Sequence, residues 1–523
     1  MGNPLGSHSG VHKIGCVYYT VPAIPPEYLS SLENIFIAYL FHSEDRGIQK
    51  VNNHIMFNAL IKELIDLHEN GISVTVNLNT YQIYFALGLM LGDNLGLNSI
   101  LGFTESYSAN HYCRICRSHK SELQKMIFES NESLRNPANY QVDVSLANYS
   151  ETGIKECCIF NQIPSYHVAV NSICDFMHDV VEGVARYDMA LIIKKLIDSK
   201  YITLEVLNTR IELFNYGTNE KRNTPPKINL NNLINGNVIM SASEMLCLLK
   251  YFALIIGDLV PRDTEVWRLY ILLRKIVDLC CARQIQPECS VLLNSLVAEH
   301  NSLYLIISKS HLKPKYHFMT HYGQLLLKNG PIILTSSIRF EAKHKVLKAY
   351  ANSIACRINL GHTLSYKLQL QMTSRFLTCR GLKPDLKLPN KSCSDINSIY
   401  TVFPFVNLPV ELKYNSLSPS WLKYKGLFYK TGMVVVLKVN LEMYLFGEIC
   451  GMIIGKSRIP YFIIKPMCTL GFDTHFYAFE IEKNSSSSSE LTGCYITNLP
   501  DPTPTITRVL ANGKIYVALK YAL

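Results

Sequence analysis

One acidic residue stands alone in a strongly basic part of the chain. Between His311 and Arg380 the only carboxylate is Glu341, and lysines and arginines lie on both sides of it. A carboxylate in such surroundings suits a metal ligand that faces a polyanion, because the cation and the basic side chains both attract phosphate. The alternative is an exposed helix on which Glu341 pairs with Lys345 at position i+4. The residues alone leave both interpretations open.

A second isolated acid follows an apolar run. Asp93 comes directly after Tyr84–Gly92 and precedes Asn94 and Gly96. A carboxylate at the carboxyl end of a buried strand can hold a metal in the crevice there. An aspartate that caps the start of a helix would give the same pattern. Two-metal phosphoryl transfer needs carboxylates that clamp cations about 4 Å apart, and Asp93 and Glu341 can meet that need if the fold brings them together.

A third group of ionisable residues lies in the segment DFMHDVVE. On a helix, Asp175, His178 and Glu182 fall at i, i+3 and i+7 and share one face. Burying them in this apolar segment is costly unless they pair or bind a metal. A polar stripe at a domain interface is the alternative. We expect Asp179, which is off that face, to be solvated.

A cysteine pair with metal-binding spacing precedes this segment. Cys113 and Cys116 form C-x2-C, which places two thiolates on one tight turn as tetrahedral zinc requires. We predict a closed structural zinc site formed by Cys113, Cys116, Cys158 and His167. His119 and Cys157 are the reserve ligands, and four unrelated buried residues are the alternative.

Composition limits the classes of protein that fit. A chain of 523 residues exceeds a single core, and a net charge of +10 suits an anionic partner. Sixteen cysteines without a signal-peptide pattern predict a reducing compartment, in which cysteines pack or bind metal. The longest apolar run is too short to cross a membrane, so no membrane partner is expected.

Periodicity predicts the elements that must position these residues. Strands are expected at 13–21 and 73–79, an amphipathic helix over 31–70, and helices from about 180 to 310. Residues 381–399 have the composition of a linker. Short apolar segments from 400 to 523 predict a small β-barrel-like domain.

Three motifs, in order, resemble the CACTA (En/Spm-like) group of DDE transposase-derived proteins. They are GDNLGLNSILGFTESYSANHYCRIC at 92–116, CDFMHDVVEGV at 174–184, and LKPKYHFMTHYGQLLLKNGP at 312–331 followed by IRFEAKHKVLK at 338–348. The likeness covers about residues 2–380, and the β-rich unit also resembles the tail of such proteins.

The resemblance implies an α/β RNase H-like core with a zinc-binding insertion and an all-α insertion, followed by a small all-β C-terminal domain. The implied segments are core at 1–106 and 168–185, zinc-binding insertion at 107–167, helical insertion at 186–310, basic segment completing the core at 311–380, linker at 381–399 and β domain at 400–523. It also implies nuclear location, with DNA as the partner; assembly into a homo-oligomer is left open.

The same resemblance implies roles for single residues. Asp93 is the second catalytic acid and Glu341 the last, both ligands of catalytic Mg²⁺, with Asp175 and His178 packed beside the site. The zinc positions match Cys113, Cys116, Cys158 and His167. The expected DNA contacts are Arg339, Lys343, Lys345 and Lys348.

Two departures from the family pattern bear on activity. The first catalytic Asp of the family lies just before an N-P-[LF]-G element, whereas only Met1 and Gly2 precede Asn3–Gly6 here. Thr335-Ser336-Ser337 stands where relatives tend to have a Trp. We therefore expect a truncated or decayed transposase-like protein that has lost Mg²⁺-dependent strand cleavage and transfer but still binds DNA. The alternatives are a non-enzymatic nucleic-acid or chromatin-binding protein on the same fold, and a metal-dependent hydrolase centred on Asp175, His178 and Glu182.

Overall fold

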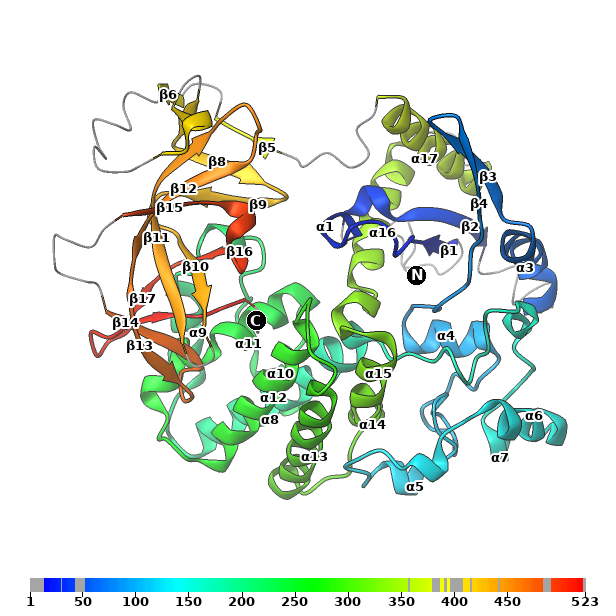
Figure 1. Cartoon of the computed structure of the whole chain (residues 1–523). Helices are drawn as coiled ribbons and strands as arrows, with labels where there is room; N and C mark the ends of the chain where they lie inside the picture. Colours follow the sequence, from blue (N-terminus) through cyan, green and yellow to red (C-terminus); the bar gives the residue numbers. More distant parts are fainter. Residues whose placement is uncertain are drawn as a thin grey trace. The chain divides into compact units, whose positions relative to one another are not determined.

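The computed structural model divides the chain into two compact units (Figure 1). The first comprises Met1–Val180, Ser290–Asn301 and Ser310–Leu382, and the second Val181–Cys289, Ser302–Lys309 and Lys383–Leu523. The structure describes residues 14–29, 31–42, 52–355, 358–378, 386–389, 393–395, 408–413, 416–440, 443–482 and 491–520. The Asn3–Gly6 element and much of the expected 381–399 linker lie outside these ranges.

The first unit combines a small sheet, a hairpin and helices. Its strands are β1 (Ile14–Tyr19), β2 (Phe36–His42), β3 (Ile72–Val76) and β4 (Asn79–Ile83). Its helices are α1 (Pro26–Leu29), α3 (Asn53–Glu69), α4 (Asn94–Leu101), α5 (Lys120–Leu123), α6 (Pro137–Leu146), α7 (Tyr149–Thr152), α14 (Pro314–Thr320), α15 (Tyr322–Asn329), α16 (Ile338–Ser353) and α17 (Leu360–Leu377). Helix α13 (Cys289–Ser308) contributes residues to both units.

The antiparallel pair β1–β2 is covered by helices on both faces. Ile14 packs in a core cluster with residues of α16 and α17, and Cys16 and Tyr18 border the same cluster. Val17 faces a second cluster that contains Phe57 of α3. This division follows from the two-residue period of a strand. The result is an α/β arrangement in which the sheet separates two apolar layers.

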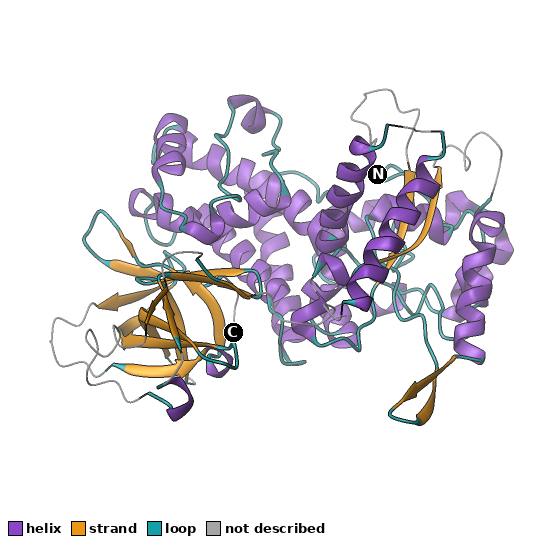
Figure 2. Ribbon diagram, turned by 90° about the horizontal axis from the view of Figure 1, so that it is seen from above, coloured by secondary structure: helices purple, strands orange, loops and turns teal. Residues whose placement is uncertain are grey.

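Two of the expected elements in this unit are wrong. Residues 31–70 are not one helix, because Phe36–His42 forms β2 and only Asn53–Glu69 is helical. The strand expected at 73–79 ends at Val76, since Asn77 and Leu78 both have positive φ and turn the chain into β4. The hairpin projects from the surrounding helices (Figure 2).

The apolar run before Asp93 also differs from expectation. Residues 84–92 form no strand, and no described strand pairs with them. The segment has no regular secondary structure, and side chains anchor its backbone: the Leu87 amide donates to Ser165 Oγ over 3.0 Å. Asp93 therefore follows an irregular segment rather than a buried strand.

The second unit begins with a helical block. Its helices are α8 (Ala185–Asp198), α9 (Leu204–Leu213), α10 (Leu230–Ile234), α11 (Ala242–Ile256) and α12 (Glu265–Cys281). Helix α11 starts with a capping box in which Ser241 and Glu244 satisfy each other's backbone amides. Its apolar residues are buried almost all round, as expected for a helix at the centre of a bundle.

The C-terminal part of this unit is all β. A five-strand path β15-β12-β11-β10-β16 is joined by β6 and β7, a second sheet runs β13-β14-β18-β17, and a third runs β5-β8-β9. The bounds are β5 (Leu386–Lys387), β6 (Cys393–Asp395), β7 (Leu417–Pro419), β8 (Trp421–Tyr424), β9 (Leu427–Lys430), β10 (Val434–Val439), β11 (Tyr444–Ile454), β12 (Pro460–Pro466), β13 (Cys468–Asp473), β14 (Ala478–Glu482), β15 (Thr492–Tyr495), β16 (Asp501–Thr505), β17 (Arg508–Val509) and β18 (Ile515–Val517).

Polar contacts attach the β region to the helical block within this unit. The Trp267 indole donates to the His475 carbonyl over 3.1 Å, and Arg262 pairs with Asp473 at 2.8 Å.

The element order confirms the expected mixed α/β chain with an all-β C-terminal region. No helix in the described ranges has both the length and the hydropathy needed to cross a membrane.

Candidate functional site

Four buried side chains of the first unit converge on one point. They are Cys113 and Cys116, from the C-x2-C turn, and His317 and His321, from α14 and its junction with α15. One ligand atom from each lies within 4.8 Å of all the others. The two histidines are four residues apart, which places their rings on one side of a helical turn. This Cys2His2 cluster could hold a metal ion.

The contact distances within the cluster are short. Cys113 Sγ lies 3.5 Å from His321 Nε2, and Cys116 Sγ lies 3.3 Å from His317 Nε2. The two Nε2 atoms are 3.2 Å apart. All four residues are buried, so these polar atoms depend on one another or on a bound ion rather than on bulk water.

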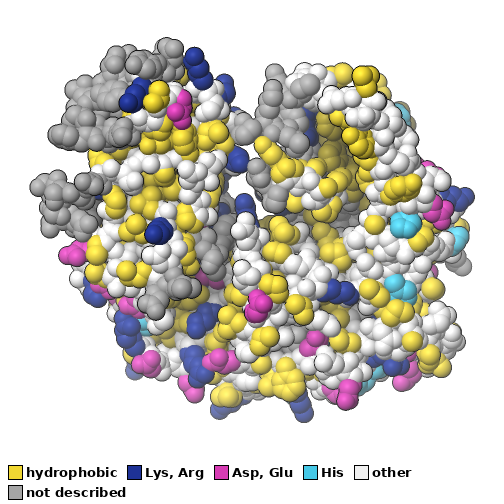
Figure 3. All heavy atoms as spheres, viewed as in Figure 1, with side chains coloured by type: hydrophobic (Ala, Val, Ile, Leu, Met, Phe, Trp, Pro, Cys, Tyr) yellow, Lys and Arg dark blue, Asp and Glu magenta, His cyan; other side chains and the backbone are white. Residues whose placement is uncertain are grey.

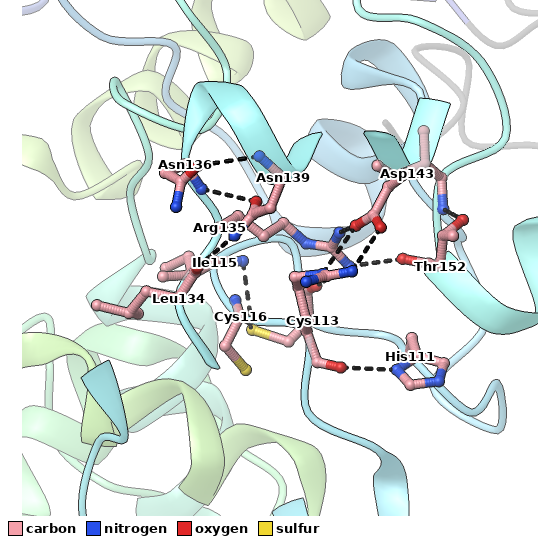
Figure 4. Close-up of polar contacts among 12 residues, drawn as sticks. His111, Cys113, Ile115, Cys116, Leu134, Arg135, Asn136, Asn139, Asp143 and Thr152 are labelled. Atoms are coloured by element: carbon pink, nitrogen blue, oxygen red, sulfur yellow. Dashed lines mark hydrogen bonds and ion pairs between the residues drawn. The ribbon is translucent and has the colours of Figure 1, made fainter. Parts of the chain in front are cut away.

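Neighbouring side chains fix the ligands. Glu129 Oε1 lies 2.5 Å from His321 Nδ1, a contact that orients the ring and leaves Nε2 for the cluster. Beside the cysteine turn, buried Arg135 bonds to Asp143 at 2.9 Å and to the Thr152 carbonyl at 2.6 Å (Figure 4). In contrast, His317 Nδ1 is buried and has no hydrogen-bond partner in the described structure.

Without a metal, the cluster's electrostatics favour one thiolate, at Cys113, because the hydrogen bond to Cys113, burial and the Cys113 charge raise the pKa of Cys116 well above its ordinary value. Burial opposes ionisation of Cys113, but the Cys116 hydrogen bond and the charges of His317 and His321 lower its pKa well below the ordinary value. Burial likewise opposes a charged His321, yet Cys113 and Glu129 raise its pKa to about 9. The thiolate form is the one that ligates metals.

The sequence-based ligand set is half right. Cys113 and Cys116 lie in the cluster, whereas Cys158 and His167 lie elsewhere. Cys158 belongs to the apolar core under α3 and α4, where its amide donates to Tyr140 Oη over 2.9 Å. The His167 ring packs edge-on against Tyr140 at 5.4 Å. Both side chains thus contribute to packing rather than to the cluster.

The reserve ligands are also placed outside the cluster. His119 caps α5, with Nδ1 2.8 Å from Ser121 Oγ, and Cys157 is exposed. The residues that sequence reasoning missed are His317 and His321. Their H-x3-H spacing is a recognised signal for two metal ligands on one helical face, and it stood inside the motif at 312–331.

A second polar group forms around Asp175. His178 Nδ1 lies 2.5 Å from Asp175 Oδ2, and the Ser337 hydroxyl donates to the same oxygen over 2.6 Å. The Ser337 amide donates to Asp175 Oδ1 over 2.8 Å. Burial raises the pKa of Asp175, but these bonds and the charge of His178 lower it overall. Ser337, which sequence reasoning noted only as a departure from the family, holds Asp175 in place.

Asp93 and Glu341 both act on His178. Burial lowers the pKa of this imidazole, but Asp175, Asp93 and Glu341 together raise it above the ordinary value. Partial desolvation raises the pKa of Glu341; His178 lowers it, and Asp93 and Asp175 raise it. The charges of the four groups therefore influence one another, and Asp175 and His178 are in direct contact. Among described residues, however, only the Cys2His2 cluster brings three or more metal-binding side chains within 4.8 Å.

Local structure explains how the two acids are presented. Asp93 is the N-cap of α4 and accepts a hydrogen bond from the Gly96 amide at 2.5 Å. The helix-cap alternative for Asp93 is therefore confirmed, and the expected buried strand before it is wrong; the cap uses Oδ1, and Oδ2 is not part of it. Glu341 lies in the first turn of α16 and is exposed.

The remaining acids of the DFMHDVVE segment correct two expectations. Asp179 is fully buried rather than solvated: it accepts a hydrogen bond from Asn94, which in turn accepts one from Arg114 at 2.6 Å. Burial raises the pKa of Asp179 to about 7. Met177–Val184 is π-helical rather than α-helical, with non-helical backbone angles at Glu182, and Glu182 pairs with Arg186 at 3.3 Å.

The predicted phosphate contacts divide into two kinds. Arg339, Lys345 and Lys348 are exposed on α16. Lys343 is buried, and its Nζ donates to the Leu32 carbonyl over 2.7 Å, so its charge is used inside the fold. On the face drawn in Figure 3, basic and acidic side chains are interspersed rather than gathered into one basic field.

No protein-family model and no curated protein matches this chain. The assignment of a function therefore depends on the residues and their geometry.

Proposed function

We propose that the Cys2His2 cluster is a structural zinc site. Tetrahedral zinc with Zn–S near 2.3 Å and Zn–N near 2.05 Å requires S–N separations of about 3.6 Å and N–N separations of about 3.3 Å. The measured S–N distances of 3.5 and 3.3 Å and the N–N distance of 3.2 Å agree with these values to a few tenths of an ångström. Four protein ligands also leave no open coordination position, which is the pattern of a structural site.

We further propose that the chain is a transposase-derived, RNase H-like protein that binds DNA. The support for this proposal is that the charges of Asp93 and Glu341 both act on His178, although the three residues come from segments far apart in the sequence. The two-sided packing of β1–β2 between helices is compatible with such a core. Asp93 and Glu341 would hold a divalent cation, Mg²⁺ or Mn²⁺, that faces the phosphate backbone.

The same arrangement leads us to expect weak or absent strand cleavage. A two-metal clamp needs carboxylates for both cations. Asp175 is already engaged by His178 and Ser337, so it serves to position the imidazole. Among the described residues of this neighbourhood, Asp93 and Glu341 would then be the carboxylates left to hold the cations, and they would compensate the transition-state charge incompletely.

DNA affinity would come from exposed basic residues of α16. Each phosphate contact contributes to a binding constant that falls with salt concentration, with a slope of about 0.9 per contact. Arg339, Lys345 and Lys348 can supply such contacts without any catalytic acid. Binding should therefore survive Glu341→Gln.

The experiment is a fluorescence-anisotropy titration of a labelled duplex at several salt concentrations. Lys345→Glu with Lys348→Glu should weaken binding and flatten the salt dependence. A matched control is Lys62→Glu with Lys125→Glu, which changes two exposed lysines of the same unit. If both double variants lose DNA affinity equally, the effect comes from net charge alone, and α16 is not the DNA-binding surface.

A further inference from the structure

A cavity in the second unit is lined by the segment after α9 and by residues of the β region. Its volume is about 570 Å³, within the range of about 300–1,000 Å³ that ligand pockets occupy. The apolar part of its wall includes Ile211, Phe214, Tyr216, Pro225 and Ile506. Part of the lining is therefore apolar and comes from residues that include two aromatic side chains.

Buried polar contacts hold this wall in shape. Arg508 is 5% exposed and stacks on the Tyr251 ring at 4.2 Å. Its guanidinium donates to the carbonyls of Asn215 and Tyr216 at 3.1 and 3.4 Å. Next to the lining residue Thr218, the Asn219 amide exchanges two hydrogen bonds with the backbone of Phe428 in β9, the strand that carries Lys430, at 3.0 and 3.1 Å. The cavity is thus preformed from two parts of the chain.

The rim of the cavity is cationic. Three lysines and one glutamate line it, an excess of two positive charges. Lys227 is neutralised by Glu212 at 2.9 Å. Lys221 and Lys430 are exposed, and no ion pair of either is found among the described residues. The hydroxyls of Thr218 and Thr224 add hydrogen-bonding groups beside them.

We propose that this cavity binds a nucleoside phosphate, with the phosphate oxygens at Lys221 and Lys430 and the base against the apolar wall. A purely inorganic anion would leave the wall unused, and a neutral apolar ligand would leave the two ammonium groups unmatched. A nucleoside phosphate has a planar body and several anionic oxygens, so it satisfies both. Its source is either a free nucleotide or the phosphorylated end of a strand. None of the acids of the first unit takes part, so this site stands or falls independently of the proposed function.

The test is isothermal titration calorimetry on the full chain. The probes are nucleoside diphosphates, the parent nucleosides, inorganic pyrophosphate, and a dinucleotide with or without a 5′-phosphate. Lys221→Glu with Lys430→Glu should weaken nucleotide binding by about tenfold or more, since two charge-assisted contacts become repulsive. The matched control is Lys194→Glu with Lys456→Glu, two exposed lysines of the same unit that do not line the cavity.

We expect the nucleoside diphosphate or the 5′-phosphorylated dinucleotide to bind more tightly than nucleoside or pyrophosphate alone, with the control unchanged within about twofold. Preference for the diphosphate assigns free nucleotides as the source, and preference for the phosphorylated dinucleotide assigns strand ends. The inference is overturned if neither binds, if pyrophosphate binds as tightly as either, or if the cavity variant and the control lose affinity equally.

Discussion

Replacing His321 by alanine should release the metal that we assign to the Cys2His2 cluster, whereas replacing His167 should not. The two changes compare the ligand set found in the structure with the one expected from sequence. His321 Nε2 is 3.5 Å from Cys113 Sγ and 3.2 Å from His317 Nε2. His167 packs on Tyr140 instead.

The size of the effect follows from sharing the binding energy among four ligands. Structural zinc sites have apparent binding free energies of roughly 10–16 kcal/mol, or roughly 2.5–4 kcal/mol for each ligand. Losing one ligand should therefore weaken binding by about a hundredfold to a thousandfold. Removing the Glu129 carboxylate should lower zinc affinity less, because Glu129 only orients the His321 ring.

The assay is zinc content by mass spectrometry after dialysis against a weak chelator, together with the rate of zinc transfer to a colorimetric chelator. Wild type and His167→Ala should retain one zinc per chain, and His321→Ala should lose it. His321→Cys should restore retention, because Cys3His is also a structural zinc set. Equimolar zinc in His321→Ala, or its loss in His167→Ala, would refute the assigned ligands.

Three further outcomes are expected. Asp175→Ala should destabilise the protein by about 3–5 kcal/mol in chemical denaturation, because His178 and Ser337 lose their buried partner. A change under about 1 kcal/mol would contradict the role given to Asp175. The stabilisation from the Asp175–His178 pair should be largest between pH 3.8 and 6.5, the ordinary pKa values of the two groups. This stabilisation should fall as pH rises through the raised pKa of His178 and as pH drops through the lowered pKa of Asp175. The check is the difference in free energy of unfolding between wild type and Asp175→Asn, measured across pH. A difference that does not change with pH would show that the two charges are not coupled. Lys343→Ala should cost about 1–3 kcal/mol of stability, because the carbonyl of Leu32 loses its hydrogen-bond partner. The salt dependence of DNA binding should change little. A flattened salt dependence would show that Lys343 does contact phosphate.

The positions that sequence could predict are those with local signals. The C-x2-C turn, the helices of the second unit and the β-rich C-terminal region follow from spacing and periodicity. Asp93 as an N-cap was also visible locally, from the Asn and Gly that follow it. Each of these depends on neighbours within a few residues.

The positions that sequence missed depend on contacts across the chain. Sequence predicts Cys158 and His167 as partners of the C-x2-C turn, but the fold brings in His317 and His321 from some two hundred residues away. Asp179 was expected to be solvated because a regular helix was assumed. The π-helical turn changes which side chains point inward, and Asn94 then provides a buried partner. The strand Phe36–His42 is apolar on both faces because helices cover both, which hid its two-residue period.

The most direct measurement of the central claim is a Mn²⁺ titration followed by electron paramagnetic resonance. Wild type, Asp93→Asn, Glu341→Gln and the double variant should be compared, each with its zinc content verified. If the two acids share a cation, each single change should weaken Mn²⁺ binding, and the double change should weaken it by less than the sum of the two. Mn²⁺ affinity that is unchanged in either single variant would contradict the account.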